Sequence, residues 1–397
     1  MTRRSPIGLL ASALVLLPAL GMAQEEPERN PGGVEGGYDP SVGLFVTDSE
    51  AGFNLSLGAY SQFRYSMNWR EDRADSVQDF EQEFSIPRTE IFLQGSYTDR
   101  LDFQLRTSIT DGSDFELFVA YLAYRFSEDW NVTIGKQFIP LSREDWQYAQ
   151  DLLAIDFSAN DNTFAAGTAL GLVLNATIQD WLRFWIALDD GSFSAKRVLP
   201  MAEESDALLS GRFEFQIAGT DWSVWDDLIG RRGRPFSVLV GIAPAYLVRT
   251  GKDLRFGDEH QLNLDLSLNG DGYQVLVAGS WTARNPRLAD RYNNYGLYAQ
   301  GGFFVSDTWQ LYGRYDFVSP GDQPALGSQE LEDFTAVSAG LNWLPFRRTN
   351  RWKISAEVGH LFSALNNTIV APSGTLGWLA SDTAGQALLR LQAQFGF

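Results

Sequence analysis

The sequence predicts a sixteen-stranded antiparallel transmembrane β-barrel. Three observations predict this fold. Many short segments alternate apolar and polar residues, the connections between them alternate short and long, and no stretch after residue 23 has the roughly 20 apolar residues that a membrane helix needs. The alternating segments are long enough to cross a bilayer at a tilt, which takes roughly 9 to 11 residues.

The N-terminus has the layout of a secretory signal peptide. Arg3 and Arg4 precede an apolar run from Ile7 to Leu20, and small residues follow before Gln24. We therefore expect residues 1–23 to be removed and residues 24–52 to form a periplasmic lead-in. Its first part, 24–41, is Glu-, Pro- and Gly-rich with almost nothing to bury, which predicts a flexible segment. Residues 53–397 would form the barrel.

Composition narrows the function. The chain has no cysteine, which excludes disulfides and a lipid anchor on cysteine. The formal net charge of -19 argues against nucleic acid as a partner and suits acidic loops that face lipopolysaccharide. The sequence holds no recognisable metal-ligand cluster and no Gly-x-Ser-x-Gly elbow, so we expect no cofactor, no metal ion and no catalytic residue.

The last strand illustrates the pattern. From Gln386 onward, Leu389 and Leu391 fall on one face and Arg390 on the other, and the chain ends on the aromatic Phe397. The same alternation places strands near 53–70, 84–98, 101–110, 115–126, 130–138, 167–177, 181–190, 208–217, 236–248, 260–269, 273–284, 293–304, 308–318, 333–344, 351–363 and 384–397.

The connections have the rhythm of a transmembrane barrel. Short links such as 98–100, 127–129 and 306–307 alternate with long ones such as 139–166 and 364–383. Short periplasmic turns and longer outer loops are typical of these barrels, whereas a soluble β-sandwich has no reason to alternate loop lengths. One long connection, 219–235, falls where a short turn is due, and we expect a small helix beneath the barrel there.

Aromatic side chains near the strand ends favour a membrane over a soluble core. Interface-seeking rings form two girdles around such barrels. The expected periplasmic girdle contains Trp130, Trp309, Trp343, Trp352, Phe395 and Phe397, and the expected outer girdle contains Trp69, Trp281, Tyr295, Tyr315 and Phe317.

Residues 84–144 carry a family resemblance. Residues 135–144, Gly-Lys-Gln-Phe-Ile-Pro-Leu-Ser-Arg-Glu, resemble the Gly-Gln-Phe-Lys-x-Pro-Phe-Ser-x-Glu pattern of phosphate-selective porins O and P, with Lys136 and Gln137 in swapped order and Leu141 in place of an aromatic. The resemblance implies sixteen strands, a homotrimer and a pore constricted by an inward-folded third outer loop, here residues 139–166. The charged and aromatic residues expected in that constriction are Arg143, Glu144, Asp145, Tyr148, Asp151, Asp156 and Asp161.

If the apolar faces meet lipid, the alternate residues line the lumen. The candidate pore-lining bases are Arg64, Arg88, Arg106, Arg183, Arg212, Arg314, Lys353 and Arg390. Rows of guanidinium groups can pass an anion from site to site. Alternatively, these bases pair with inward carboxylates and leave a mixed-charge pore; the candidate partners are Glu90, Asp102, Glu214, Asp265, Asp316 and Glu357.

We therefore expect passive diffusion of small hydrophilic solutes and ions across an outer membrane, with lipid and lipopolysaccharide around the barrel and anion preference as a second hypothesis. Phosphate specificity is not expected, because the third loop has one base, Arg143, against several acids.

Two alternatives remain open. A barrel hydrolase would need a histidine near the outer rim, where His360 lies on a strand and points outward, while His260 is the other histidine of the chain. A closed structural or adhesin barrel would need bulky side chains inside. Glycines on predicted inward faces argue against it because they leave room; these are Gly58, Gly171, Gly241, Gly296 and Gly340.

Overall fold

The computed structural model describes residues 33–40, 42–70, 80–110, 114–191, 207–248, 257–287, 290–323, 330–347, 349–372 and 376–397. The expected signal peptide and the start of the lead-in, up to residue 32, lie outside this range. None of the described helices is long and apolar enough to cross a membrane.

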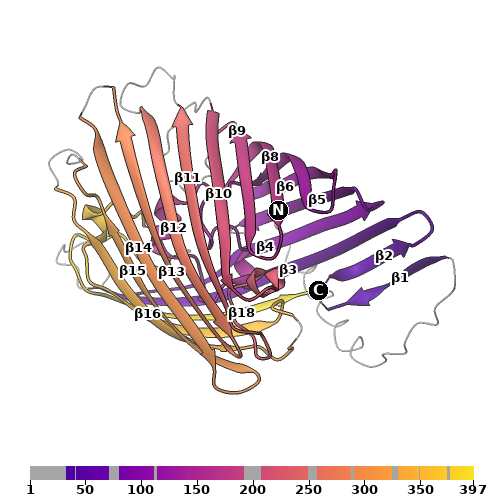
Figure 1. The fold of residues 1–397 in the computed structure, drawn as a ribbon. Coiled ribbons are helices and arrows are strands. Elements are labelled where there is room, and N and C mark those ends of the chain that lie inside the picture. The colour runs from indigo at the N-terminus through magenta and orange to yellow at the C-terminus, as the bar shows by residue number, and fades with distance from the viewer. Residues whose placement is uncertain are drawn as a thin grey trace, which may run out of the picture.

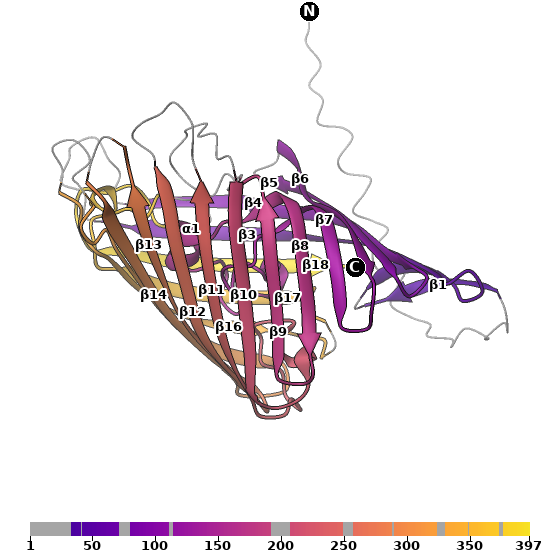
Figure 2. The same cartoon turned by 45° about the horizontal axis from the view of Figure 1, so that its top comes forward.

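Sixteen strands, β3 to β18, form a closed antiparallel barrel (Figures 1 and 2). Each strand pairs with the next along the chain, and β18 returns to β3, with Ala387 opposite Trp69 and Gly396 opposite Tyr60. The first eight are β3 (Phe53–Trp69), β4 (Phe80–Tyr97), β5 (Leu101–Thr110), β6 (Asp114–Arg125), β7 (Trp130–Phe138), β8 (Thr168–Ile178), β9 (Leu182–Asp189) and β10 (Ala207–Ala218). The others are β11 (Ser237–Val248), β12 (Asp258–Gly270), β13 (Tyr273–Asn285), β14 (Tyr292–Phe304), β15 (Trp309–Ser319), β16 (Phe334–Trp343), β17 (Lys353–Leu361) and β18 (Gln386–Gly396).

The predicted barrel is confirmed, and most strand ends fall within two residues of the expected ones. The largest difference is β4, which begins at Phe80 rather than near residue 84. Phe80 pairs with Trp69 at the outer end of β3, and their rings lie 5.2 Å apart. This cross-strand aromatic contact stabilises the additional pairing of residues 80–83 with the end of β3.

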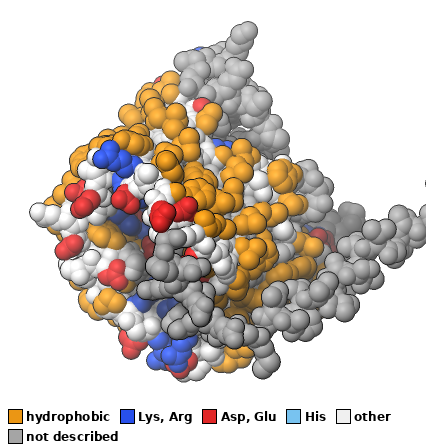
Figure 3. All heavy atoms as spheres, turned by 90° about the vertical axis from the view of Figure 1, so that its right-hand side faces the viewer, with side chains coloured by type: hydrophobic (Ala, Val, Ile, Leu, Met, Phe, Trp, Pro, Cys, Tyr) orange, Lys and Arg blue, Asp and Glu red, His pale blue; other side chains and the backbone are white. Residues whose placement is uncertain are grey.

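Burial along the strands is reversed relative to a soluble protein. On β12, Asp265 and Ser267 point inward and are buried, whereas Leu264 and Leu266 point outward and are 48% and 41% exposed. Figure 3, which views the molecule from the side of the β1–β2 hairpin, shows hydrophobic side chains gathered over a broad part of that face. Exposed apolar patches this broad are rare on soluble monomers and are typical of the lipid-facing surface of transmembrane barrels.

Part of the segment 24–41, expected to be flexible, forms a strand, so that expectation is wrong for Val34–Asp39. Strands β1 (Val34–Asp39) and β2 (Gly43–Asp48) form a hairpin, and β2 pairs with the first five residues of β3. β18 cannot cover those residues, because Phe397 already pairs with Ala59 through N–H···O distances of 2.9 and 3.0 Å. The hairpin therefore pairs with backbone groups of β3 that β18 does not reach. We call the hairpin and the adjoining ends of β3 to β6 the lip; its hairpin projects beyond the barrel in Figure 1.

The connection between β10 and β11 lies inside the barrel, not beneath it as expected. It contains the 3₁₀ helix η2 (Trp222–Trp225), whose Trp225 is 1% exposed. Leu228 N–H donates to the Asp151 carbonyl at 3.0 Å, and the Asn269 amide donates to the Val224 carbonyl at 2.9 Å. The apolar side chains of this segment are buried, which explains why it turns into the lumen. The remaining short helices are η1 (Ala149–Asp151), α1 (Ala159–Phe164) and η3 (Leu365–Asn367).

Candidate functional site

The third outer loop, residues 139–167 between β7 and β8, crosses the lumen and reaches the far wall. Lys353 Nζ on β17 donates to the Leu152 carbonyl at 2.8 Å. Asn342 Nδ2 on β16 donates to the Leu153 carbonyl at 2.8 Å. Backbone carbonyls of the loop are thus held by side chains that the sequence places on inward faces, and in these contacts the loop is folded inward as the resemblance implies.

Short-range contacts give the loop its own shape. The Asp145 carboxylate accepts the Gly167 N–H at 2.8 Å and so ties the beginning of the loop to its end. Ser142 Oγ accepts from the Asp145 N–H at 3.3 Å, and Ser158 Oγ caps helix α1 by accepting the Asp161 N–H at 3.0 Å. Serine and aspartate are suited to such caps, because their short side chains reach nearby backbone donors.

Asp156 joins the loop to two strands. Its Oδ2 lies 2.8 Å from Arg64 Nη2 on β3, and its Oδ1 lies 2.8 Å from Arg88 Nη2 on β4. Its side chain is 1% exposed. Burial alone would raise the pKa of Asp156, but the two guanidinium groups hold that pKa well below its usual range. The ionised Asp156 carboxylate therefore lies between Arg64 and Arg88, two bases of the predicted row.

A second carboxylate of the loop, Glu144, is linked to the same region through Arg314, which also donates to the Asp156 carbonyl at 2.7 Å. Arg314 on β15 lies 3.2 Å from Asp316 and 3.7 Å from Glu144. The Ser158 N–H donates to Glu144 Oε2 at 2.9 Å. Burial raises the pKa of Glu144 to about 7 despite the opposing effect of Arg314.

A third cluster surrounds Glu214 on β10. Its carboxylate accepts from Arg212 at 2.8 Å, from Arg183 on β9 at 2.7 Å and from Arg143 of the loop at 3.2 Å. Arg212 also lies 2.8 Å from Asp265 on β12. Three bases and two carboxylates therefore meet where the loop leaves β7.

Two further pairs complete the wall. Arg106 on β5 pairs with Glu90 on β4, and its guanidinium lies 3.5 Å from the ring centroid of Tyr148. Arg390 on β18 pairs with Glu357 on β17, with Nε at 3.1 Å from Oε1.

All eight predicted pore-lining bases thus point inward. The seven arginines each contact at least one carboxylate, and Lys353 contacts loop carbonyls. Five of the six predicted carboxylate partners form ion pairs with these arginines: Glu90, Glu214, Asp265, Asp316 and Glu357. Asp102 pairs instead with Arg125. The structure therefore places the bases in ion pairs, the arrangement expected for a mixed-charge wall.

The last two acids of the predicted constriction differ in setting. Asp161 is buried within α1. Asp151 accepts from Asn350 Nδ2 at 3.1 Å, and burial together with Asp227 raises the pKa of Asp151 to about 6. Asp227 belongs to the segment between β10 and β11, so this acid lies where the loop meets that segment.

The loop between β17 and β18 also lies inward, which the sequence did not indicate. Its Leu365, Val370 and Trp378 pack with Phe164 of α1 in one buried cluster. The Gly377 carbonyl accepts from Asn68 Nδ2 on β3 at 3.0 Å. The signal in the sequence that could have indicated this inward position is the presence of several large apolar residues in an outer loop.

The inward glycines receive neighbouring groups rather than leave room, so that expectation is wrong. A Cβ added at Gly340 would lie 2.3 Å from the Tyr312 ring, and one at Gly296 would lie 2.0 Å from the Asn160 side chain of the loop. At Gly58 the Phe92 ring would lie at 2.4 Å. Absence of a side chain at these positions is what allows rings and the loop to approach the wall.

Inward residues near the periplasmic ends of β6 to β9 remain partly exposed. Arg183 has a side-chain exposure of 19%. The other partly exposed inward residues in this region are Tyr121, Asn131, Asn175 and Thr177. Within the described residues, water therefore reaches the inner wall on this side.

Both histidines face outward. His360 pairs across the sheet with Val337 and contacts the Phe362 ring at 4.6 Å, and His260 stacks on Tyr246 at 4.7 Å. Among the described residues, no group of three or more His, Cys, Asp or Glu side chains could hold a metal ion.

Comparisons with known proteins bear on this geometry. The family described as phosphate-selective porin O and P matches residues 58–195. No curated protein matches the chain in sequence.

Solved structures share the fold over most of the chain. An anion-selective porin from Comamonas acidovorans is 13% identical, with a TM-score of 0.59 over 87% of this chain and 100% of that one. The outer membrane channel DcaP of Acinetobacter baumannii is 13% identical, with a TM-score of 0.57 over 88% and 99%. OmpT of Vibrio cholerae, in-vitro folded and in trimer form, is 12% identical, with a TM-score of 0.57 over 86% and 99%.

These structural matches establish the barrel architecture. The family match covers most of β3, the strands β4 to β9 and the third outer loop. The resemblance carried by residues 135–144 is confirmed, because these residues lie within the range 58–195 that matches the phosphate-selective porin O and P family.

Proposed function

We propose that the protein is an outer-membrane porin for passive diffusion of small hydrophilic solutes and ions, narrowed by the third outer loop. The observation that carries this proposal is the reversed burial: charged and polar side chains fill the inward faces while leucines and aromatic residues cover the outward ones. A barrel of this kind puts its polar wall around an aqueous path.

The charges of the wall support weak selectivity rather than phosphate specificity. Each arginine of the expected row contacts a carboxylate, and Asp156 occupies the place between Arg64 and Arg88 where an anion would bind. Among the described residues, the arginines of this row are paired with carboxylates, so we infer a small preference between potassium and chloride.

Reversal potentials of the purified mature protein in planar bilayers test this function. Under a tenfold KCl gradient, we expect stable conductance and a reversal potential close to zero. A reversal potential near the chloride equilibrium value would instead support a row of available arginines. Absence of any conductance would contradict the porin proposal.

A closed structural barrel is the second candidate, and a specific observation favours it. The third loop, the loop between β17 and β18 and the segment between β10 and β11 all have buried residues inside the barrel. The same bilayer recording separates the two, because a closed barrel inserts without conducting.

The hydrolase alternative gains no support from the site. His360 faces outward and has an aromatic ring as its contact, whereas a catalytic histidine is oriented by a nucleophile and a carboxylate or amide. In a lipid-hydrolysis assay, we expect the His360→Ala variant and the unmodified protein to give the same result.

We also propose a homotrimer in an outer membrane, from the family resemblance and from the trimer form of the Vibrio cholerae protein. The layout of residues 1–23 supports export by a cleaved leader. Analytical ultracentrifugation in density-matched detergent tests the trimer, and N-terminal sequencing of the mature protein tests cleavage before Gln24.

A further inference from the structure

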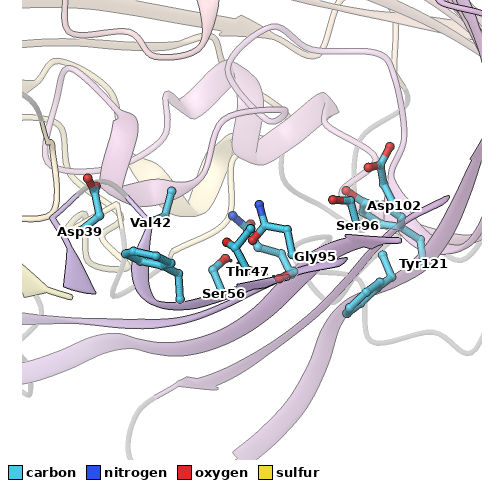
Figure 4. Close-up of a pocket in the computed structure, with 12 residues that line it drawn as sticks. Asp39, Val42, Thr47, Ser56, Gly95, Ser96, Asp102 and Tyr121 are labelled. Atoms are coloured by element: carbon cyan, nitrogen blue, oxygen red, sulfur yellow. Dashed lines mark hydrogen bonds between the residues drawn. The ribbon is translucent and has the colours of Figure 1, made fainter. Parts of the chain in front are cut away.

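The lip carries a pocket of about 510 Å³ on its inner face (Figure 4). This volume falls within the range of about 300 to 1,000 Å³ that is usual for small-molecule sites. The pocket lies on β2, the beginning of β3, the end of β4 and the neighbouring parts of β5 and β6. It is therefore outside the arginine network of the lumen.

Cross-strand register lines the pocket with two rows of side chains. In the first row, Thr47 is opposite Asn54, Asn54 is opposite Ser96, and Ser96 is opposite Asp102. In an antiparallel sheet such neighbours have Cβ atoms about 5 Å apart. Figure 4 shows Thr47 between the Asp39 end of the pocket and the end formed by Ser96, Asp102 and Tyr121.

The second row combines polar groups with aromatic rings. Phe45 is opposite Ser56, Ser56 is opposite Gln94, and Tyr121 lies further along the same row beyond Gln104. Phe45 rests on Gly37, where an added Cβ would lie 3.0 Å from the ring, so the ring is held against the hairpin. Hydroxyl and amide groups thus alternate with apolar surface.

The charge of the pocket differs from that of the barrel wall. Among the described residues that line the pocket, none is a lysine or an arginine. Its two charged residues are Asp39 and Asp102, and Asp102 is paired with Arg125 at 2.5 Å. Such a lining disfavours anions, because a buried or partly buried negative charge near carboxylates is repelled.

We propose that this pocket binds a neutral, hydroxyl-rich solute of the size of a mono- or disaccharide. Hydroxyl and amide groups on side chains whose Cβ atoms are about 5 Å apart can donate to and accept from the hydroxyl groups of one sugar ring, and Phe45 offers an apolar face to the C–H side of that ring. This inference goes beyond the proposed pore, because binding at the lip does not require conduction.

Isothermal titration of the folded mature protein in detergent with maltose, glucose and the anion gluconate tests the proposal. We expect saturable binding of maltose or glucose and binding of gluconate at least tenfold weaker. The double variant Asn54→Ala, Ser96→Ala should lose at least tenfold in affinity. Thr47→Val, which removes a hydroxyl group at nearly constant shape, should lose affinity in the same direction.

The matched control is Asn175→Ala, Thr177→Ala, which removes the same two kinds of group from an inward face outside the pocket. It should bind maltose like the unmodified protein. The proposal would be overturned if the control variant lost as much affinity as the double variant, if no saccharide bound, or if gluconate bound as tightly as glucose.

Conductance in planar bilayers separates this failure from failure of the pore. A protein that conducts but binds no saccharide refutes the lip site alone. A protein that binds saccharide at the lip without conducting supports the site and contradicts the porin proposal. Folding of every variant is checked by circular dichroism before titration.

Discussion

Asp156→Asn should destabilise the barrel and make its interior more positive. The carboxylate lies 2.8 Å from both Arg64 and Arg88, and the three side chains are 1%, 1% and 11% exposed. The substitution keeps the shape of the side chain but removes its charge. Two guanidinium groups on β3 and β4 are then left inside the barrel without that partner.

The magnitude can be worked out in two ways. Asp156 accepts three hydrogen bonds from the two guanidinium groups, two of 2.8 Å and one of 3.2 Å. The two shorter ones, at about 1.5 to 3 kcal/mol each for bonds to charged groups, together give about 3 to 6 kcal/mol. Removal of one member of a buried ion pair costs about 3 to 5 kcal/mol. Because asparagine retains one oxygen acceptor, we expect a loss near the lower end, about 3 kcal/mol.

Equilibrium urea unfolding in lipid vesicles, followed by tryptophan fluorescence, measures this loss. Bilayer recording should show a reversal potential shifted toward the chloride equilibrium value, because two cations become available. The control Asp99→Asn changes an exposed aspartate in the turn between β4 and β5 and should leave both readouts unchanged. An unfolding free energy within about 1 kcal/mol of the original, with an unchanged reversal potential, would refute the role of Asp156.

Three further outcomes follow from the structure. Burial raises the pKa of Glu144 to about 7, so the stabilisation from its protonated form is present below about pH 4.5 and is lost as the pH rises through 7. Urea unfolding between pH 5 and 8 should show that the unfolding free energy falls less steeply with pH in Glu144→Gln, because the variant lacks the one proton that Glu144 releases. Trp225→Ala removes a side chain that is 1% exposed and should cost about 3 to 5 kcal/mol by the same assay, whereas an effect below 1 kcal/mol would contradict its packing. Deletion of Phe397 removes its pairing with Ala59 and should lower the yield of folded barrel in an in vitro refolding assay; an unchanged yield would contradict that closure.

The strands could be predicted because a membrane barrel repeats one local rule. Each strand must place apolar residues outward and polar residues inward, and each strand such as β12 carries that period of two in its own sequence. The turn-and-loop rhythm adds a second local signal. Neither signal requires knowledge of which strands are neighbours.

The lip and the inward segments could not be predicted in the same way. β2 is short and adjoins Glu- and Gly-rich sequence, and it forms because β3 extends beyond the end of β18. Trp225 and Trp378 belong to connections whose hydrophobic residues have no fixed period, so their burial depends on a cavity that exists only after the barrel closes.

The sequence by itself determined the number of strands, their direction, their two faces and the inward position of the eight bases. The tertiary structure alone decided what those bases contact. Arg64, Arg88 and Asp156 are far apart along the chain, and only the closed barrel with its loop folded inside brings them within 2.8 Å. A charge in a strand specifies which face it occupies, but its partner is fixed by packing across the lumen, which no local pattern encodes.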